Sequence, residues 1–133
     1  MEQIIENNLL HKDLTDVIIK CYYNVYNSLG YGFLEKVYGN AMFIELTQNG
    51  LNCVKQKPIN VRYKNEIVGD YFADLIVNDS IIIELKAGES LAKEHEFQLI
   101  NYLRATNIEV GLLLNFGKKP EFKRKIFTND RKS

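Results

Sequence analysis

The chain has 133 residues, of which 46% are hydrophobic and 26% charged, a composition that fits one globular domain and excludes disordered and collagen-like classes. Its 17 basic and 17 acidic residues balance, so composition alone gives no case for a nucleic-acid partner. The two cysteines, Cys21 and Cys53, exclude a four-cysteine zinc or iron–sulfur site from one chain and suggest reduced thiols.

Two segments bear on cellular location and partners. Residues 1–8 lack the basic and apolar segments of a signal peptide, and no apolar run approaches the length of a membrane span. We therefore expect a soluble, cytoplasmic protein. Residues 118–133 hold seven basic and two acidic residues, and we interpret them as a solvated, partly frayed terminus, with a phosphate-facing patch as the alternative.

Helical periodicity comes first along the chain. Apolar residues recur at helical spacing in two segments, one ending at about Ser28 and one over residues 33–48. Asp13 or Thr15 is the expected cap of the first helix, since side chains of these types bond the free N–H groups of a first turn. Asn49-Gly50 is the expected stop of the second helix, because such residues adopt a left-handed conformation readily.

After residue 53 the apolar period changes from helical to two, which is typical of strands. The expected elements are strands over 54–63, 67–77 and 81–86, a helix over about 91–106, a buried strand over 110–114, and a strand or helical turn over 122–127. This order predicts one α/β domain with its core at about 12–127. A three-stranded antiparallel meander and a further strand form its mixed central sheet, flanked by helices.

Charged residues interrupt two of the expected strands. Asp74 lies within the apolar segment 73–77, and Glu84-Leu85-Lys86 ends the apolar run 81–83. Burying an unpaired charge is costly, so such carboxylates and an ammonium need compensation. A divalent cation would provide it. The alternative for Glu84 and Lys86 is a solvated ion pair at the end of a strand, which is common and contributes little.

The length of the connection between these strands decides whether the two acids meet. If residues 78–80 form the loop of a hairpin, Val77 faces Ile81 and Asp74 falls opposite Glu84. Lys86 then lies on the same face as Glu84, because side chains two apart on a strand point the same way. A two-residue loop would instead turn the carboxylates to opposite faces of the sheet.

Three further polar elements belong beside the acid pair. Glu35 and Tyr38 are three residues apart and share a face of the second helix, and Gln98 and Tyr102 are four apart and share a face of the third. Gln56, on the first expected strand, is a weaker candidate. Each has a plain alternative: Glu35 is a surface acid, and the tyrosines are core aromatics whose hydroxyls bond a nearby carbonyl.

In combination these motifs resemble those of the GxxExxY protein family, which is grouped with the PD-(D/E)XK nuclease superfamily. The matching pieces are Gly32-x-x-Glu35-x-x-Tyr38, Ala73-Asp74-Leu75-Ile76-Val77, Glu84-Leu85-Lys86, Gln98-x-x-x-Tyr102 and the segment 111–117. The Gln-x-x-x-Tyr helix is the mark of the RecB-type branch. The resemblance covers about residues 12–127. Ala73 stands where the superfamily name has proline, a change that leaves the carboxylate chemistry untouched.

The resemblance implies a restriction-endonuclease-like core that binds Mg²⁺ or Mn²⁺. Asp74 and Glu84 would be metal ligands, with the Leu85 carbonyl as a third by analogy, and Glu35 would bind the same ion directly or through water. Lys86 would orient or deprotonate the attacking water, or stabilise the phosphate. As further catalytic-site residues, Gln98 and Tyr102 would hold Lys86, the water or the substrate backbone.

The function expected from these residues is metal-dependent hydrolysis of phosphodiester bonds in DNA, with RNA left open. The alternative is a non-catalytic nucleic-acid-binding or dimerisation module that keeps the nuclease fold. A short, neutral chain has little surface for gripping a duplex, so a homodimer or a larger nucleic-acid-processing complex is also expected.

Overall fold

The computed structural model describes residues 10–132, so the expectation about a signal peptide in residues 1–8 lies outside the described residues. The elements in chain order are α2 (Lys12–Leu29), α3 (Glu35–Gln48), β1 (Cys53–Tyr63), β2 (Glu66–Val77), β3 (Ile81–Lys86), α4 (Lys93–Arg104), β4 (Val110–Phe116), β5 (Pro120–Ile126) and η1 (Asn129–Arg131). Within this part of the chain, no helix has the length and apolar character needed to cross a membrane.

The strands form one sheet in the order β1-β2-β3-β4-β5. β3 and β4 are parallel and all other neighbours are antiparallel. The expected mixed α/β sheet is confirmed, and α4 provides the crossover that parallel neighbours need. The sheet has two strands beyond the meander where the expected core had one, because residues 120–126 pair with β4 as β5. Of the two alternatives for residues 122–127, the strand is the one observed. The frayed-terminus interpretation therefore fails for this segment.

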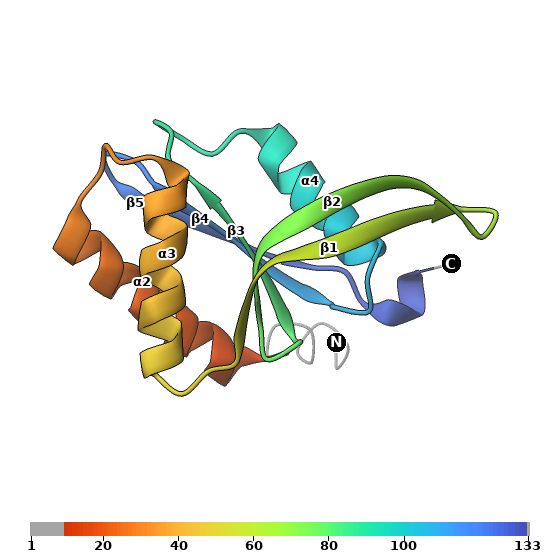
Figure 1. Ribbon diagram of the computed structural model, residues 1–133, viewed down its shortest axis with the longest axis horizontal. Helices are drawn as coiled ribbons and strands as arrows, with labels where there is room; N and C mark the ends of the chain where they lie inside the picture. Colours follow the sequence, from red (N-terminus) through yellow and green to blue (C-terminus); the bar gives the residue numbers. More distant parts are fainter. Residues whose placement is uncertain (1–9, 133) are drawn as a thin grey trace, which may run out of the picture.

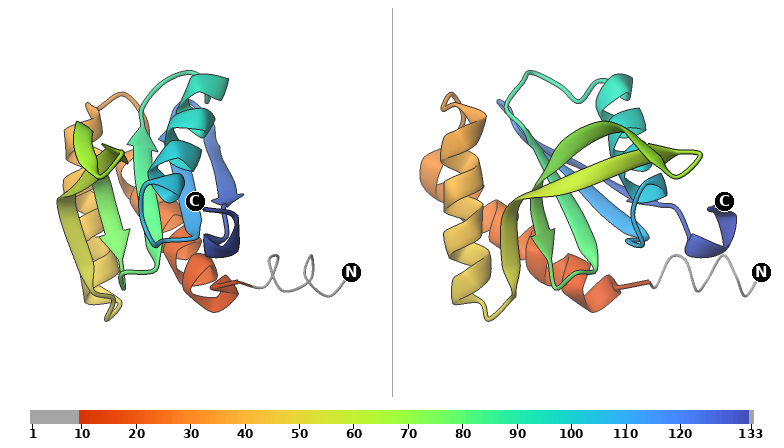
Figure 2. Two further views of the ribbon diagram at one scale, coloured as in Figure 1. Left: turned by 90° about the vertical axis from the view of Figure 1, so that its right-hand side faces the viewer. Right: turned by 45° about the vertical axis from the view of Figure 1, so that its right-hand side comes forward.

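Helices cover both faces of the sheet, with α2 and α3 on one face and α4 on the other (Figures 1 and 2). Side chains of β3 alternate between the two cores: Ile81, Ile83 and Leu85 pack with α2 and α3, whereas Ile82 packs with α4. By the same alternation, Glu84 and Lys86 belong to the face of β3 that α4 covers.

Helix ends follow the sequence only in part. α2 starts at Lys12, one turn earlier than a Thr15 cap requires, and its N-cap His11 makes no side-chain capping bond. Thr15 instead donates its backbone N–H to the His11 carbonyl at 2.9 Å, so the Asp13 and Thr15 cap predictions are wrong. The stop after α3 is confirmed, because Gly50 has a φ of 81°. Only glycine adopts such an angle without steric cost.

β1 and β2 extend beyond the rest of the sheet. They pair with each other along their length, but the ladder between β2 and β3 covers only residues 75–77 of β2. We call residues 57–73 the arm. It passes beside α4 in Figure 1 and ends in a turn at Lys64 and Asn65, whose φ angles are 50° and 67°. Ile59 is 1% exposed in the core beneath α4, so the base of the arm is fastened there.

The hairpin between β2 and β3 has the predicted register. Val77 pairs with Ile81 and Leu75 with Ile83. Asn78 and Asp79 both have a φ of 52°, the left-handed conformation that lets a short loop reverse the chain. Continuing the same register by one residue brings Asp74 opposite Glu84.

Candidate active site

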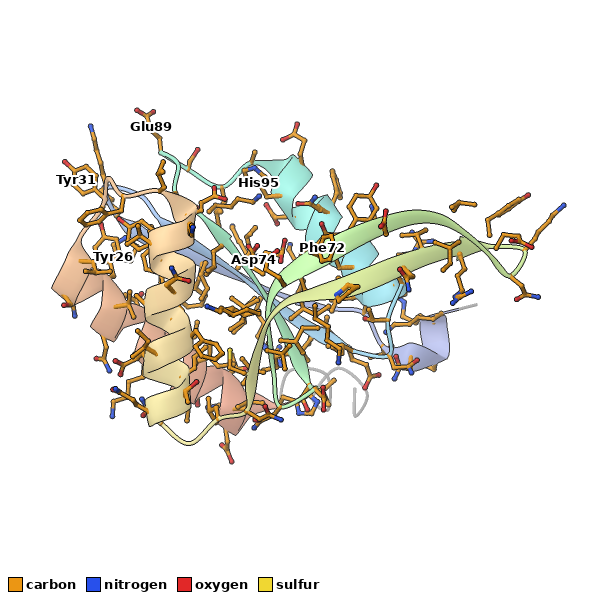
Figure 3. The ribbon with its side chains drawn as sticks, viewed as in Figure 1. Tyr26, Tyr31, Phe72, Asp74, Glu89 and His95 are labelled. Atoms are coloured by element: carbon orange, nitrogen blue, oxygen red, sulfur yellow. The ribbon has the colours of Figure 1, made fainter. Side chains whose placement is uncertain are left out.

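Asp74 and Glu84 each accept a hydrogen bond from the backbone of the other's strand, at the point where β2 separates from β3. The Asp74 backbone N–H donates to Glu84 Oε2 at 2.8 Å, and the Leu85 N–H donates to Asp74 Oδ2 at 2.8 Å. The backbone hydrogen-bond ladder between β2 and β3 stops at Leu75. Beyond it, the two carboxylates accept the N–H bonds that backbone carbonyls of the neighbouring strand would otherwise accept. Figure 3 shows Asp74 between α3 and α4. The sequence-predicted acid pair is therefore brought together.

The two carboxyl groups lie in a buried and poorly neutralised place. Glu84 is only 5% exposed, and burial raises its pKa to about 8, with the negative charge of Asp74 adding to the rise. Burial also raises the pKa of Asp74. The Lys86 ammonium lowers the pKa of both groups, whereas the Glu35 carboxylate raises both. Burial thus outweighs the available positive charge.

Lys86 and the Leu85 backbone complete the edge of β3. Lys86 is half-buried, and among residues 10–132 it forms no ion pair with either carboxylate, although its charge acts on both. The Leu85 N–H points toward β2, because it donates to Asp74. In a strand the C=O of a residue points to the same side as its N–H, so the Leu85 carbonyl also faces β2.

α3 contributes Glu35 from its exposed first turn. Its carboxylate does not join the pair as a compact cluster: within residues 10–132, no three His, Cys, Asp or Glu side chains gather as a metal-binding group. Tyr38, one turn later, is fully buried and stacks on Phe116 with ring centroids 4.1 Å apart. Its hydroxyl donates to the Gly30 carbonyl at 2.7 Å. Its interpretation as a core aromatic is confirmed.

α4 places Gln98 and Tyr102 on one face. Gln98 is half-buried and Tyr102 is 6% exposed. Burial raises the pKa of Tyr102 to about 12, and the charges of Glu84 and Asp74 add to the rise, so its hydroxyl stays protonated close to the carboxylates. α4 approaches β4 closely at Gly111, where a Cβ would lie 2.6 Å from a Leu99 methyl carbon.

Two residues contribute more than their sequence signal indicated. Gln56, only a weaker candidate, has a φ of 52°, and its side-chain amide lowers the pKa of the Asp74 carboxyl. Asn115 is fully buried, and its carboxamide accepts from the Gly88 N–H at 3.1 Å and donates to the Gly88 carbonyl at 2.9 Å. These two bonds therefore fix the position of the backbone at Gly88, just after Lys86. Its only signal is a polar residue in the apolar run 110–116.

Comparison with known proteins identifies the class. The family model of the PD-(D/E)XK nuclease superfamily matches residues 12–125, so the chain belongs to this superfamily. No curated protein matches it. Among solved structures, the crystal structure of SSO0001 is similar, with a TM-score of 0.55 and 20% sequence identity. The match covers 70% of this chain and 50% of that one, and it supports the fold.

Proposed function

We propose that this chain is a nuclease that uses Mg²⁺ or Mn²⁺ to hydrolyse phosphodiester bonds in DNA, with RNA left open as a substrate. Superfamily membership supports nuclease chemistry. The observation that carries the proposal for this chain is the pair of half-buried Asp74 and buried Glu84, on which the charge of Lys86 acts and whose charges in turn act on the Tyr102 hydroxyl. A cytoplasmic location and a homodimer or larger complex remain expectations from the sequence.

The donors at this edge of β3 fit a hard divalent cation. Asp74 and Glu84 supply carboxylate oxygens, which Mg²⁺ and Mn²⁺ prefer, and burial disfavours their ionised forms unless a cation joins them. We assign Asp74, Glu84 and the Leu85 carbonyl as ligands. Glu35 would reach the ion directly or through a water. Mg²⁺ commonly keeps several waters, so a small protein donor set is sufficient.

The side chains around the acids have separate roles in the proposed reaction. A bound cation would lower the pKa of its water and offset charge on the phosphate. Lys86 would orient or deprotonate the attacking water, or stabilise the phosphate. Tyr102 keeps its proton, so it is available as a hydrogen-bond donor to the water or the substrate. Gln98, one turn away on α4, would position Lys86, the water or the nucleic-acid backbone.

Within the superfamily we assign the chain to the GxxExxY family and the RecB-type branch. Two placements support this assignment. Glu35 lies in the first turn of α3, and its charge acts on both acids of the pair. Gln98 and Tyr102 share a face of α4, and the charges of both acids act on Tyr102, which fits the branch motif.

Cleavage by matched variants tests the proposal. The wild-type protein, Asp74→Ala, Lys86→Ala and Asp70→Ala would be incubated with plasmid and labelled oligonucleotides in Mn²⁺. Asp70 is the control, because it is an exposed aspartate on the same strand. We expect cleavage by the wild type and Asp70→Ala only, with all four circular dichroism spectra alike. Cleavage that survives both site substitutions would refute the assignment, and an inactive wild type would favour the non-catalytic binding module.

A further inference from the structure

A groove lies between the arm and α4, next to the candidate active site. Its volume is about 1000 Å³, and Gln98 and Tyr102 belong both to its lining and to the candidate site. In Figure 1 the arm extends along this side of α4. Small-molecule pockets usually have volumes of about 300–1,000 Å³, so this one is at the upper end of that range and suits part of a longer chain.

Aromatic side chains stand on both walls of the groove. Tyr71 on the arm is 47% exposed, and Phe97 on α4 is 62% exposed. The Tyr71 ring lies 5.7 Å from the ring of buried Tyr102, centroid to centroid, so the aromatic surface leads toward the acid pair. Exposed ring faces of this kind are platforms on which unpaired bases stack.

The groove also concentrates positive charge in a chain whose net charge is zero. Its lining includes Arg62, Arg104, Arg131 and Lys132, against one carboxylate, that of Glu94. The three arginines are exposed, and in the described part of the chain none of them forms an ion pair. All four side chains also contact the protein itself: Arg62 donates to the Asn65 carbonyl, Arg104 and Arg131 lie over the Phe127 ring, and Lys132 donates to the Thr106 and Ile108 carbonyls.

We propose that this groove binds a single strand of nucleic acid and leads it to the Asp74–Glu84 pair. The guanidinium groups would contact phosphates, and Phe97 and Tyr71 would stack on bases. A duplex offers no free base faces for such stacking, because its neighbouring base pairs cover them. This substrate class rests on the proposed nuclease function, but the groove itself can be tested without any cleavage.

Binding in EDTA tests the groove apart from the chemistry. Fluorescence anisotropy would compare labelled oligothymidylate, oligouridylate and a DNA duplex of equal length with the full chain. We expect at least one single strand to bind about tenfold more tightly than the duplex, which corresponds to one stacked base. The sugar of the tighter strand distinguishes DNA from RNA. Duplex binding as tight as both single strands would overturn the proposal.

Matched substitutions locate the binding surface. Phe97→Ala should weaken binding of the preferred strand about tenfold. Tyr31→Ala is the control, because Tyr31 is 57% exposed and lies in the connection between α2 and α3, at the end of the molecule opposite the arm (Figure 3). Equal effects of the two substitutions would overturn the proposal. Both side chains are more exposed than buried, so neither change threatens the fold.

Salt dependence tests the arginines. Each single-strand phosphate contact contributes about 0.7 to the slope of log K against log salt, so Arg62→Gln and Arg104→Gln should each lower that slope by about this amount. Lys20→Gln, on exposed α2 surface, is the control and should leave the slope unchanged. Unchanged slopes in both arginine variants would overturn the phosphate contacts. If these binding results hold while Mn²⁺ produces no cleavage, the groove stands and the nuclease proposal fails.

Discussion

Asn115 on β4 and the Asp74–Glu84 pair on β2 and β3 are polar residues within apolar strands, but they differ in how well the surrounding groups satisfy them. The Asn115 carboxamide is neutral, and Gly88 satisfies both its oxygen and its nitrogen. The two acids accept backbone bonds from Asp74 and Leu85, but burial disfavours the charged form of each and raises the pKa of both.

The difference separates a structural polar group from a functional one. A buried polar group with all its partners stabilises the fold, whereas buried acids with raised pKa values and too little countercharge are typical of functional sites. Removing the first should therefore weaken the fold. Neutralising Glu84 should strengthen the fold at pH values above its raised pKa, while removing what the site does.

The largest effect on stability is expected from Asn115→Ala. The Gly88 N–H and carbonyl both lose their partner, so the free energy of unfolding should fall by about 3 kcal/mol. Urea denaturation measures this change. Asn27→Ala, at an exposed position of α2, is the control and should stay within about 0.5 kcal/mol. Equal losses of unfolding free energy in the two variants would contradict the structural role of Asn115.

Glu84→Gln should alter the pH dependence of the metal-free protein. The pKa of Glu84 rises from 4.5 to about 8 on folding, so between these values the folded chain holds a proton that the unfolded chain has released. Stability from this group therefore falls as pH rises. From about pH 5 to about pH 8, the wild type should lose on the order of 3 kcal/mol more than the variant.

Urea unfolding in EDTA at several pH values provides this comparison. Glu66→Gln, an exposed glutamate on the arm, serves as the control and should keep the wild-type slope. Parallel curves for the wild type and Glu84→Gln would contradict the assigned protonation of Glu84.

Mn²⁺ should stabilise the folded protein through the acid pair. At about ten times its dissociation constant, a cation that binds only the folded state adds about 1.4 kcal/mol. Thermal melting should show this shift at pH above the pKa of Glu84 and a smaller one below it, because the cation competes with a proton. The shift should vanish in Asp74→Ala. An equal shift in that variant would place the cation elsewhere.

Tyr38→Phe is expected to have the smallest effect. Its hydroxyl donates to the Gly30 carbonyl and accepts from the Phe33 N–H, so its removal should cost about 1 kcal/mol in unfolding free energy. The stacking on Phe116 remains available to the phenylalanine ring. Chemical denaturation measures the loss, and the Mn²⁺ shift should persist. A vanished shift would make Tyr38 part of the cation site.

Local patterns predicted the acid pair because its geometry depends on local counting. The loop 78–80 fixes the register, and strand alternation then sets Asp74 against Glu84. The helices and first three strands were predicted for the same reason, since their apolar periods are regular. Gln98 and Tyr102 share a face of α4 through their spacing alone.

The features that the sequence left open or did not predict depend on distant partners. Residues 120–126 are charged and mostly exposed or half-buried, without a clear period, so the sequence left a strand and a helical turn open over 122–127; they form β5 because the edge of β4 supplies the pairing. The bonds of Asn115 are to Gly88, which lies in a different segment. The groove exists because β2 separates from β3 after a short ladder. No local sequence pattern in the arm predicts that separation.

The loop 78–80 also limits how the chain can change. Most exposed connections accept an inserted residue, because the added cost of closing a slightly longer loop is small. One residue added here would shift the register between β2 and β3 and turn one carboxylate through to the opposite face. The strands would still pair, yet the acids would no longer meet. An exposed connection without chemistry of its own therefore carries a constraint as strict as that on the acids themselves.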